Sequence, residues 1–277
     1  MKHYDIAIFG ATMLAAGIIQ SLSEEKRKDC IVIESSFNYA SDYVPSMKAA
    51  RIENTGKEPL CDRANELLTS LRERGIVDGD GNIHVFPLSA VCSSLLSDCR
   101  VLLGTSVTSV EKESNTGERI IKYINSAGFG SISAKKVIDT TNLGVLRSNE
   151  GLRLTEKSGA RKYLCASLAK CSENAKDICG FSADGVSAVK GAIGDEYILK
   201  LAVKENAGYA AAREYLAAKW ASLSVKEFSG WKIGAVAATF EYDYASPVRI
   251  SKNLCEFIPS TSYANPIDSF EGGLLCF

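Results

Sequence analysis

The residues near the N-terminus have the types and spacing that a dinucleotide-binding unit requires. An apolar segment over residues 4–9 runs into Gly10, a helical segment follows, and a second apolar segment ends on Glu34 roughly 20 residues later. Gly10 would allow the tight turn, and a helix starting near Thr12 would direct its free N–H groups at a pyrophosphate. Glu34 would accept hydrogen bonds from ribose hydroxyls. The stretch therefore predicts a nucleotide site.

The glycine fingerprint of this unit is incomplete. Its three positions read Gly10, Thr12 and Ala15. Alanine is an accepted variant at the third position, whereas Thr12 puts a side chain where the backbone should approach the phosphates closely. A plain buried strand, turn and helix stays open as an alternative. The cofactor-binding residues expected in this unit are Gly10, Ala11, Thr12, Met13, Ala15, Glu34 and Ser35.

Length and composition indicate a globular protein. The 277 residues are 46% hydrophobic and 23% charged, with a formal net charge of −1. No basic field is available for nucleic acid or anionic lipid, so we expect neither nucleic-acid nor membrane partners. The apolar run that ends near Ile19 is interrupted by Asp5 and Gly10, and it is shorter than the roughly 20 residues of a membrane span. It predicts a strand plus a helix, and hence a cytoplasmic protein.

The nine cysteines are scattered, with no Cys-x-x-Cys pair and only two histidines in the chain. An odd number without a convincing signal peptide favours reduced, mostly buried thiols. The pattern disfavours a zinc site and a redox dithiol, and we expect no metal.

Periodicity predicts the remaining elements. Helices are expected over 14–22, 60–75, 88–99 and 206–220, and the charged run 23–29 is expected to be a solvated loop. Residues 35–57 show little periodicity and predict a long irregular connection. Strands or strand pairs are expected over 101–111, 119–124, 131–144, 162–168, 197–203 and 231–244, with a small meander at 106–134.

Residues 137–142, Val-Ile-Asp-Thr-Thr-Asn, resemble the Val-Ile-Asp-Ala-Thr-Gly strand of one enzyme family. With the nucleotide unit, the long loop, the helix and the meander in the same order, the chain resembles the FAD-dependent oxidoreductases of the glutathione-reductase-like flavoprotein fold. The resemblance covers roughly residues 4–34, 84–144 and 246–272. It implies FAD as cofactor, a backbone contact of Val107 with the adenine, and further cofactor-binding residues Thr140, Thr141, Asn142 and Asn265.

The chain departs from the family at several positions. Thr12 and Asn142 replace glycines beside the cofactor, no glycine pair follows Glu34, and the chain stops at Phe277 where the closing helix should run. These departures indicate a diverged or truncated member.

The predicted fold class is α/β, a Rossmann-like FAD/NAD(P)-binding domain with a β-meander, plus an interleaved mixed α+β substrate region. We expect residues 1–144 with 246–277 to form the first part and residues 145–245 the second. The leading functional hypothesis is an FAD-dependent oxidoreductase that passes a hydride or electron pair between a small organic substrate and flavin. The alternatives are a non-catalytic ligand- or partner-binding protein on a relict flavoprotein fold and, more weakly, an NAD(P)-binding dehydrogenase.

No catalytic residue is assigned from the sequence. Arg249 could bind a substrate carboxylate or the electron-rich edge of the flavin, although a surface or salt-bridged arginine is favoured. His84 could act as an acid or base, although a structural role is favoured for a lone histidine beside a turn. The sequence does not indicate an oligomeric state.

Overall fold

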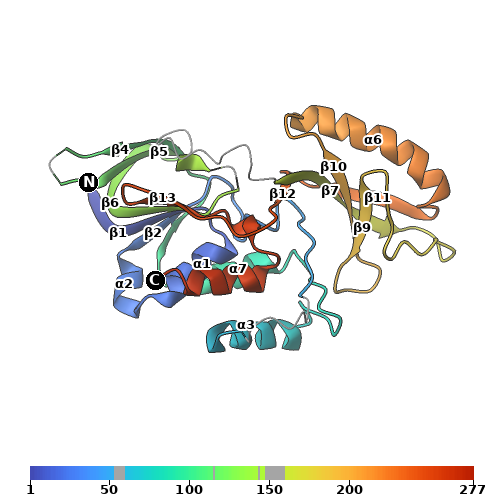
Figure 1. The fold of residues 1–277 in the computed structure, drawn as a ribbon, viewed down its shortest axis with the longest axis horizontal. Coiled ribbons are helices and arrows are strands. Elements are labelled where there is room, and N and C mark those ends of the chain that lie inside the picture. Colours follow the sequence, from blue (N-terminus) through green and yellow to red (C-terminus); the bar gives the residue numbers. More distant parts are fainter. Residues whose placement is uncertain (53–59, 115, 143, 147–159) are drawn as a thin grey trace. The chain divides into compact units, whose positions relative to one another are not determined.

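A computed structural model describes residues 1–52, 60–114, 116–142, 144–146 and 160–277 (Figure 1). The chain forms two compact units, the first made of Met1–Asp42, Leu88–Gly159 and Tyr244–Phe277, and the second of Tyr43–Pro87 and Ala160–Asp243. The sequence-based division kept residues 43–87 with the nucleotide-binding part. They group instead with the second unit, because Met47 and Ala49 bury their side chains against Cys165 and Ile198.

The first unit is built on a mostly parallel sheet. Strand order is β13-β14-β6-β1-β2-β3, and β4 and β5 join β6 as the predicted meander. Neighbouring strands from β14 to β3 are parallel. The strands are β1 Lys2–Phe9, β2 Cys30–Ile33, β3 Arg100–Leu102, β4 Ser106–Lys112, β5 Arg119–Asn125, β6 Gly128–Asp139, β13 Ile250–Lys252 and β14 Cys255–Phe257.

The apolar runs in β1 and β2 explain their central position. All four residues of β2 and the last four of β1 are buried, as strands covered on both faces require. β6 has two roles, since its first half pairs with β5 in the meander and its second half lies parallel to β1. The end of β6 is thereby brought beside the end of β1.

Helices of the first unit are α1 Met13–Ser21, α2 Glu24–Lys28, α4 Leu88–Leu95 and α7 Pro266–Leu274, with a short 3-10 turn η2 at Ser260–Ser262. The prediction of a loop over 23–29 is wrong, because α2 forms there. Its acidic residues lie in the first turn and its basic residues in the last, which suits the helix dipole. α7 packs along α1 (Figure 1), so a helix does follow the stretch around Asn265.

The second unit is an antiparallel sheet with a covering helix. The order is β11-β7-β10-β9-β8, and β12 also pairs with β7. Tyr197, Leu199 and Leu201 point from β10 into one core with α6, as the alternation predicted. The elements are β7 Arg161–Lys170, β8 Ser182–Ala183, β9 Val186–Lys190, β10 Tyr197–Val203, β11 Trp231–Val236, β12 Glu241–Asp243, α3 Asp62–Glu73 and α6 Tyr209–Lys226.

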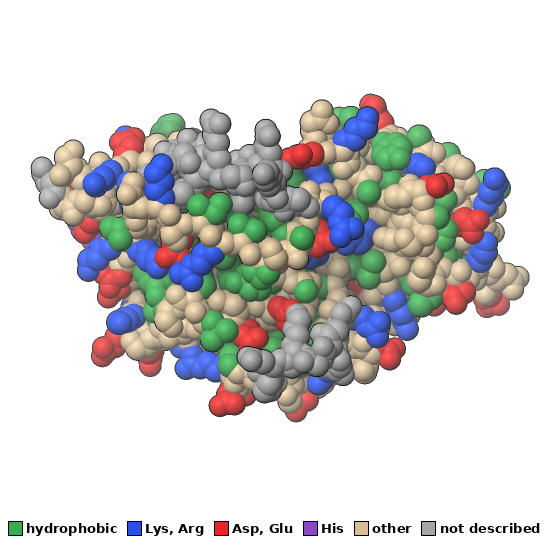
Figure 2. Space-filling model, viewed as in Figure 1, with side chains coloured by type: hydrophobic (Ala, Val, Ile, Leu, Met, Phe, Trp, Pro, Cys, Tyr) green, Lys and Arg blue, Asp and Glu red, His purple; other side chains and the backbone are tan. Residues whose placement is uncertain are grey.

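Surface charges of both signs are interspersed over the described residues of the face shown in Figure 2, in line with the formal net charge of −1. Within the described ranges, no helix has the length and apolarity that crossing a bilayer demands. The N-terminal apolar run forms β1 and α1, as predicted.

Candidate nucleotide site

Gly10 makes the predicted turn between β1 and α1. Its φ of 95° lies in the left-handed region that favours glycine. Its N–H donates to the Ile33 carbonyl at 2.9 Å, and a Cβ at this position would lie 2.9 Å from the Thr140 hydroxyl. The turn therefore requires glycine for its conformation and for the close approach of β6.

Thr12 fills the space that a fingerprint glycine would leave open. It is 1% exposed and is the N-cap of α1, where its Oγ1 accepts the Ala15 N–H at 3.0 Å. The same hydroxyl donates to Thr140 Oγ1 at 2.8 Å, and Thr140 donates onward to the Phe9 carbonyl at 2.8 Å. Thr12 and Thr140 thus connect the start of α1 to the ends of β1 and β6.

Glu34 is buried at the end of β2, and its carboxylate faces the turn at Gly10 and Ala11. Its Oε2 accepts the Ala11 N–H at 3.0 Å, and its Oε1 accepts the Ser36 N–H at 2.7 Å and the Ser35 hydroxyl at 3.4 Å. A carboxylate has about four lone-pair positions, so these contacts leave acceptor capacity for a ribose hydroxyl. Glu34 orders its own loop and holds the turn at Ala11.

The first N–H groups of α1 already have acceptors within the protein. The Met13 N–H donates to Asp42 Oδ2 at 3.2 Å, and the Leu14 N–H donates to Ser260 Oγ at 3.4 Å. The Ser260 hydroxyl donates to the same Asp42 oxygen, and Ser269 Oγ lies 2.6 Å from Ser260 Oγ. The Asp42 carboxylate therefore stands at the helix N-terminus, where the sequence predicted the pyrophosphate.

Sequence reasoning missed Asp42, Ser260 and Ser269. Asp42 falls in the segment that shows little periodicity, and Ser260 is 218 residues further along the chain. Asp and Ser are common in loops, so neither residue carries a signal without the fold.

The end of β6 lies at the same place, as the resemblance implied. The Asp139 Oδ1 accepts the Thr141 hydroxyl at 2.6 Å and the Thr141 N–H at 3.0 Å. Asn142 Oδ1 accepts the Thr261 hydroxyl at 2.8 Å, which ties the segment to η2. Thr140 thus reaches the turn directly, whereas the side chains of Thr141 and Asn142 support the loop that follows β6.

Val107 and Asn265 occupy different positions. Val107 is half-buried on β4, just after Thr105, whose N–H donates to the Glu34 carbonyl at 2.9 Å. Asn265 is the buried N-cap of α7, and its Oδ1 accepts the N–H groups of Ile267 and Asp268, each at 2.9 Å. Val107 follows a segment bonded to Glu34, while the Asn265 side chain is used by its own helix. Their contact with a cofactor stays a prediction.

Asp139 gives the site a titration that can be measured. Burial raises the pKa of Asp139 from 3.8 to about 6, against the opposing effect of the hydrogen bonds from Thr141 and Leu146. The folded state then holds the proton more tightly than the unfolded state. The free energy of unfolding should therefore fall, by about 3 kcal/mol for this group, as pH rises from about 4 to about 6.

Urea unfolding of the wild type and of Asp139→Asn across this pH range checks the prediction. The variant has no carboxyl at this position, so the difference between the two free energies of unfolding should change with pH in the stated direction. A difference independent of pH would contradict a raised pKa. Asp98→Asn is the matched control, because Asp98 is a half-exposed surface partner of Arg27.

The other two candidate residues each contact a carboxylate. Arg249 pairs with Glu256 at 2.7 Å, in agreement with the favoured salt-bridged interpretation. His84 Nδ1 lies 2.7 Å from Glu196 Oε1, a contact within the second unit. None of the nine cysteines forms a disulfide, and no cluster among the described His, Cys, Asp and Glu residues could hold a metal ion.

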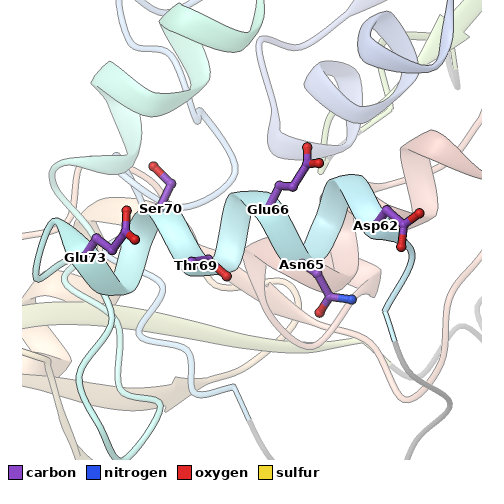
Figure 3. Close-up of a pocket in the computed structure, with 6 residues that line it drawn as sticks. All are labelled: Asp62, Asn65, Glu66, Thr69, Ser70 and Glu73. Carbon is purple, nitrogen blue, oxygen red and sulfur yellow. The ribbon is translucent and has the colours of Figure 1, made fainter.

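One hollow lies along α3, and six residues of this single helix line it (Figure 3). They include Asp62, Glu66 and Glu73, while Ala64, Leu68 and Leu71 of the same helix are buried. An amphipathic helix exposes such a polar face to water. The hollow shares no residue with the nucleotide site.

Comparison with known proteins adds information on the fold. No protein-family model and no curated protein sequence matches this chain. Among solved structures, p-nitrophenol 4-monooxygenase PnpA from Pseudomonas putida DLL-E4 is similar over 99% of this chain and 77% of its own, with a TM-score of 0.61 and 13% identity. Glycine oxidase from Geobacillus kaustophilus is similar over 99% of this chain and 94% of its own, with a TM-score of 0.59 and 11% identity.

A third similar structure is a ternary complex of aklavinone-11 hydroxylase with FAD and aklavinone. It matches 93% of this chain, which spans only 57% of the hydroxylase, with a TM-score of 0.57 and 9% identity. These likenesses confirm the predicted flavoprotein-type α/β fold. At such identities they speak for the fold alone.

Proposed function

We propose that this protein binds FAD and acts as an oxidoreductase on a small organic substrate. The observation that carries the proposal is the meeting of three distant segments at one edge of the sheet. These are the Gly10 turn, Glu34 at 3.0 Å from the Ala11 N–H, and Thr140 at the end of β6. Ligands of open α/β sheets bind at the carboxyl ends of the strands. Bound FAD would supply the redox chemistry, and the protein would hold and orient it.

The described residues fit the adenosine ribose of FAD better than they fit its pyrophosphate. Glu34 lies at the end of β2 and keeps acceptor capacity, which suits the ribose of the adenosine half. The donors at the start of α1 do not suit a pyrophosphate as they stand, because Asp42 and Ser260 already accept their hydrogen bonds.

The names of the similar proteins support an oxidoreductase in general terms. They include a monooxygenase, a hydroxylase, an oxidase and L-proline dehydrogenase from P. horikoshii. Substrates differ among those proteins, so for this chain the proposal goes no further than a small organic molecule handled by the second unit. A cytoplasmic location, expected because the N-terminal apolar run predicts a strand and a helix, is part of the same proposal.

A second candidate is a non-catalytic ligand- or partner-binding protein on this fold. The specific observation in its favour is that protein side chains, Thr12 and Asp42, occupy the positions where phosphates would lie. An NAD(P)-binding dehydrogenase explains β1, α1 and β2 but not the element over residues 137–144 that resembles the flavoprotein strand. Purified protein that absorbs at about 450 nm, a general flavin property, would support the first function over both alternatives.

Glu34→Ala should weaken FAD binding by about 1–3 kcal/mol, because it removes a buried acceptor from the ribose hydroxyls. Fluorescence titrations with FAD and calorimetric titrations with ADP should show the same loss, since both ligands contain the adenosine ribose. FMN lacks this ribose, so any affinity for FMN should be unchanged.

Glu34 also accepts the Ala11 and Ser36 N–H groups, so the variant needs a folding control. Glu34→Gln keeps one carbonyl acceptor and the side-chain length, and should lose less affinity than Glu34→Ala. Equal FAD affinity in the wild type and in a folded Glu34→Ala protein would refute the assignment. A wild type that binds neither FAD nor ADP would favour the second candidate.

A further inference from the structure

Asp42 connects two regions that are far apart in sequence. It is 1% exposed, and its Oδ2 accepts both the Met13 N–H at 3.2 Å and the Ser260 hydroxyl. Ser260 in turn accepts the Leu14 N–H at 3.4 Å and contacts Ser269 of α7. A carboxylate and two serines from both ends of the first unit thus close the N-terminus of α1.

Asp42 and an anionic ligand would compete for the same position at the N-terminus of α1. A helix N-terminus stabilises a negative charge through its free N–H groups and its dipole. Asp42 already provides that charge, and Thr12 accepts the third N–H, from Ala15. A diphosphate approaching the same donors would meet a carboxylate of like charge in a buried setting, where screening by salt is weak.

We propose that Asp42 is an internal plug, a protein carboxylate that occupies the phosphate position and must leave before a dinucleotide can bind. The inference rests on the proposed function, because it assumes that the ligand carries a diphosphate at α1. The plug makes binding a competition, and the apparent dissociation constant equals the intrinsic one divided by the fraction of molecules in which Asp42 is withdrawn.

The position of Asp42 in the chain indicates how the plug could be withdrawn. Asp42 ends the first segment of the first unit, Met1–Asp42, and Tyr43 begins the second unit. A change in the backbone of this connection would move the carboxylate away from Met13 without disturbing the parallel sheet. Events in the second unit, such as substrate binding, would thereby reach the nucleotide site through one covalent link.

Asp42→Asn tests the plug with little change of shape. The amide keeps an oxygen that can accept the Met13 N–H, but it removes the charge that competes with a diphosphate. We expect binding of both FAD and inorganic pyrophosphate, measured by calorimetry, to tighten at least tenfold relative to the wild type. Asp98→Asn, which neutralises a surface carboxylate paired with Arg27, should leave both affinities unchanged.

A second variant and a second measurement guard against misfolding. Asp42→Ala removes the acceptor of the Met13 N–H entirely, so hydrogen exchange at the Met13 amide should become faster than in the wild type, with no ligand present. Ser260→Ala removes the other acceptor and should accelerate exchange at Leu14. Both readouts are independent of FAD.

The outcomes separate this inference from the proposed function. Tighter pyrophosphate binding and faster exchange in the Asp42 variants, with no FAD binding in any protein, would support the plug and refute FAD as the cofactor. Unchanged pyrophosphate affinity in Asp42→Asn together with unchanged exchange in Asp42→Ala would overturn the plug, whatever FAD does. Tight FAD binding that is equal in the wild type and Asp42→Asn would overturn the plug and leave the proposed function intact.

Discussion

Glu241→Gln should lower the free energy of unfolding by about 3–5 kcal/mol, because it leaves a buried ammonium group without its counter-charge. Glu241 is fully buried in the second unit, where its Oε1 pairs with Lys200 Nζ at 2.6 Å and its Oε2 accepts the Cys165 thiol at 3.0 Å. Burial, and then the charge of Glu241, raises the pKa of Cys165 well above 9.0, so the thiol stays protonated and donates. Glutamine preserves the volume and isolates the effect of charge.

The direction of the Lys200 pKa shift also indicates that Glu241 stabilises the charged form of Lys200. Burial lowers the pKa of Lys200, but the charge of Glu241 and its hydrogen bond outweigh burial and leave the value above 10.5. The folded state therefore binds this proton more tightly than the unfolded state. The resulting stabilisation is present below about pH 10.5 and is lost as pH rises through the folded-state pKa.

Urea denaturation of the wild type and variants measures the effect. Glu111→Gln is the matched control, since Glu111 pairs with Lys122 at 2.8 Å but both side chains are about half exposed. Such an exposed pair contributes little to stability, because solvent screens both charges. Replacing both partners, as in Glu241→Leu with Lys200→Met, should recover much of the loss. A Glu241→Gln loss no larger than the control would show that Lys200 is not held as a buried charge.

Gly273→Val should destabilise the first unit by about 3 kcal/mol or more, by forcing α7 away from α1. A Cβ at Gly273 would overlap the Leu14 carbonyl oxygen and lie 2.7 Å from the Ile18 nitrogen. Facing it, a Cβ at Gly17 would overlap the Phe270 carbonyl oxygen. Both neighbours are helix backbone, which cannot move aside as a flexible side chain would.

Gly79→Val is the matched control, because a Cβ there meets nothing within 4 Å and its φ is not positive. We expect a change within about 0.5 kcal/mol at this position. Thermal unfolding of both variants checks the difference. A Gly273→Val protein as stable as the control would show that α1 and α7 are not in close contact.

Local pattern accounts for most of the architecture that was predicted correctly. Continuous apolar runs in β1 and β2 specify buried parallel strands, and the alternation in β10 specifies a strand with two different faces. The approximate bounds of α1, α3 and α4 follow from apolar spacing. These elements could be predicted from the sequence because their apolar patterns repeat over a few neighbouring residues.

Other elements were missed because their stability comes from distant parts of the chain. β14 is three residues long and lies beside β6, more than 100 residues earlier in the sequence. The short helix α2 carries no apolar stripe, so its charged residues were interpreted as a loop. Residues 43–87 contain no local signal that assigns them to the second unit.

At the candidate site, the sequence by itself determined the Gly10 turn, the start of α1 near Thr12 and the carboxylate at Glu34, because each depends on residues adjacent in the chain. Only the tertiary structure decided what those groups contact. It paired Thr12 with Thr140, turned Glu34 toward Ala11, and set Asp42 with Ser260 at the first N–H groups of α1. Hydrogen bonds act over about 3 Å in space, whatever the separation in sequence, so a contact across 218 residues leaves no trace in local spacing.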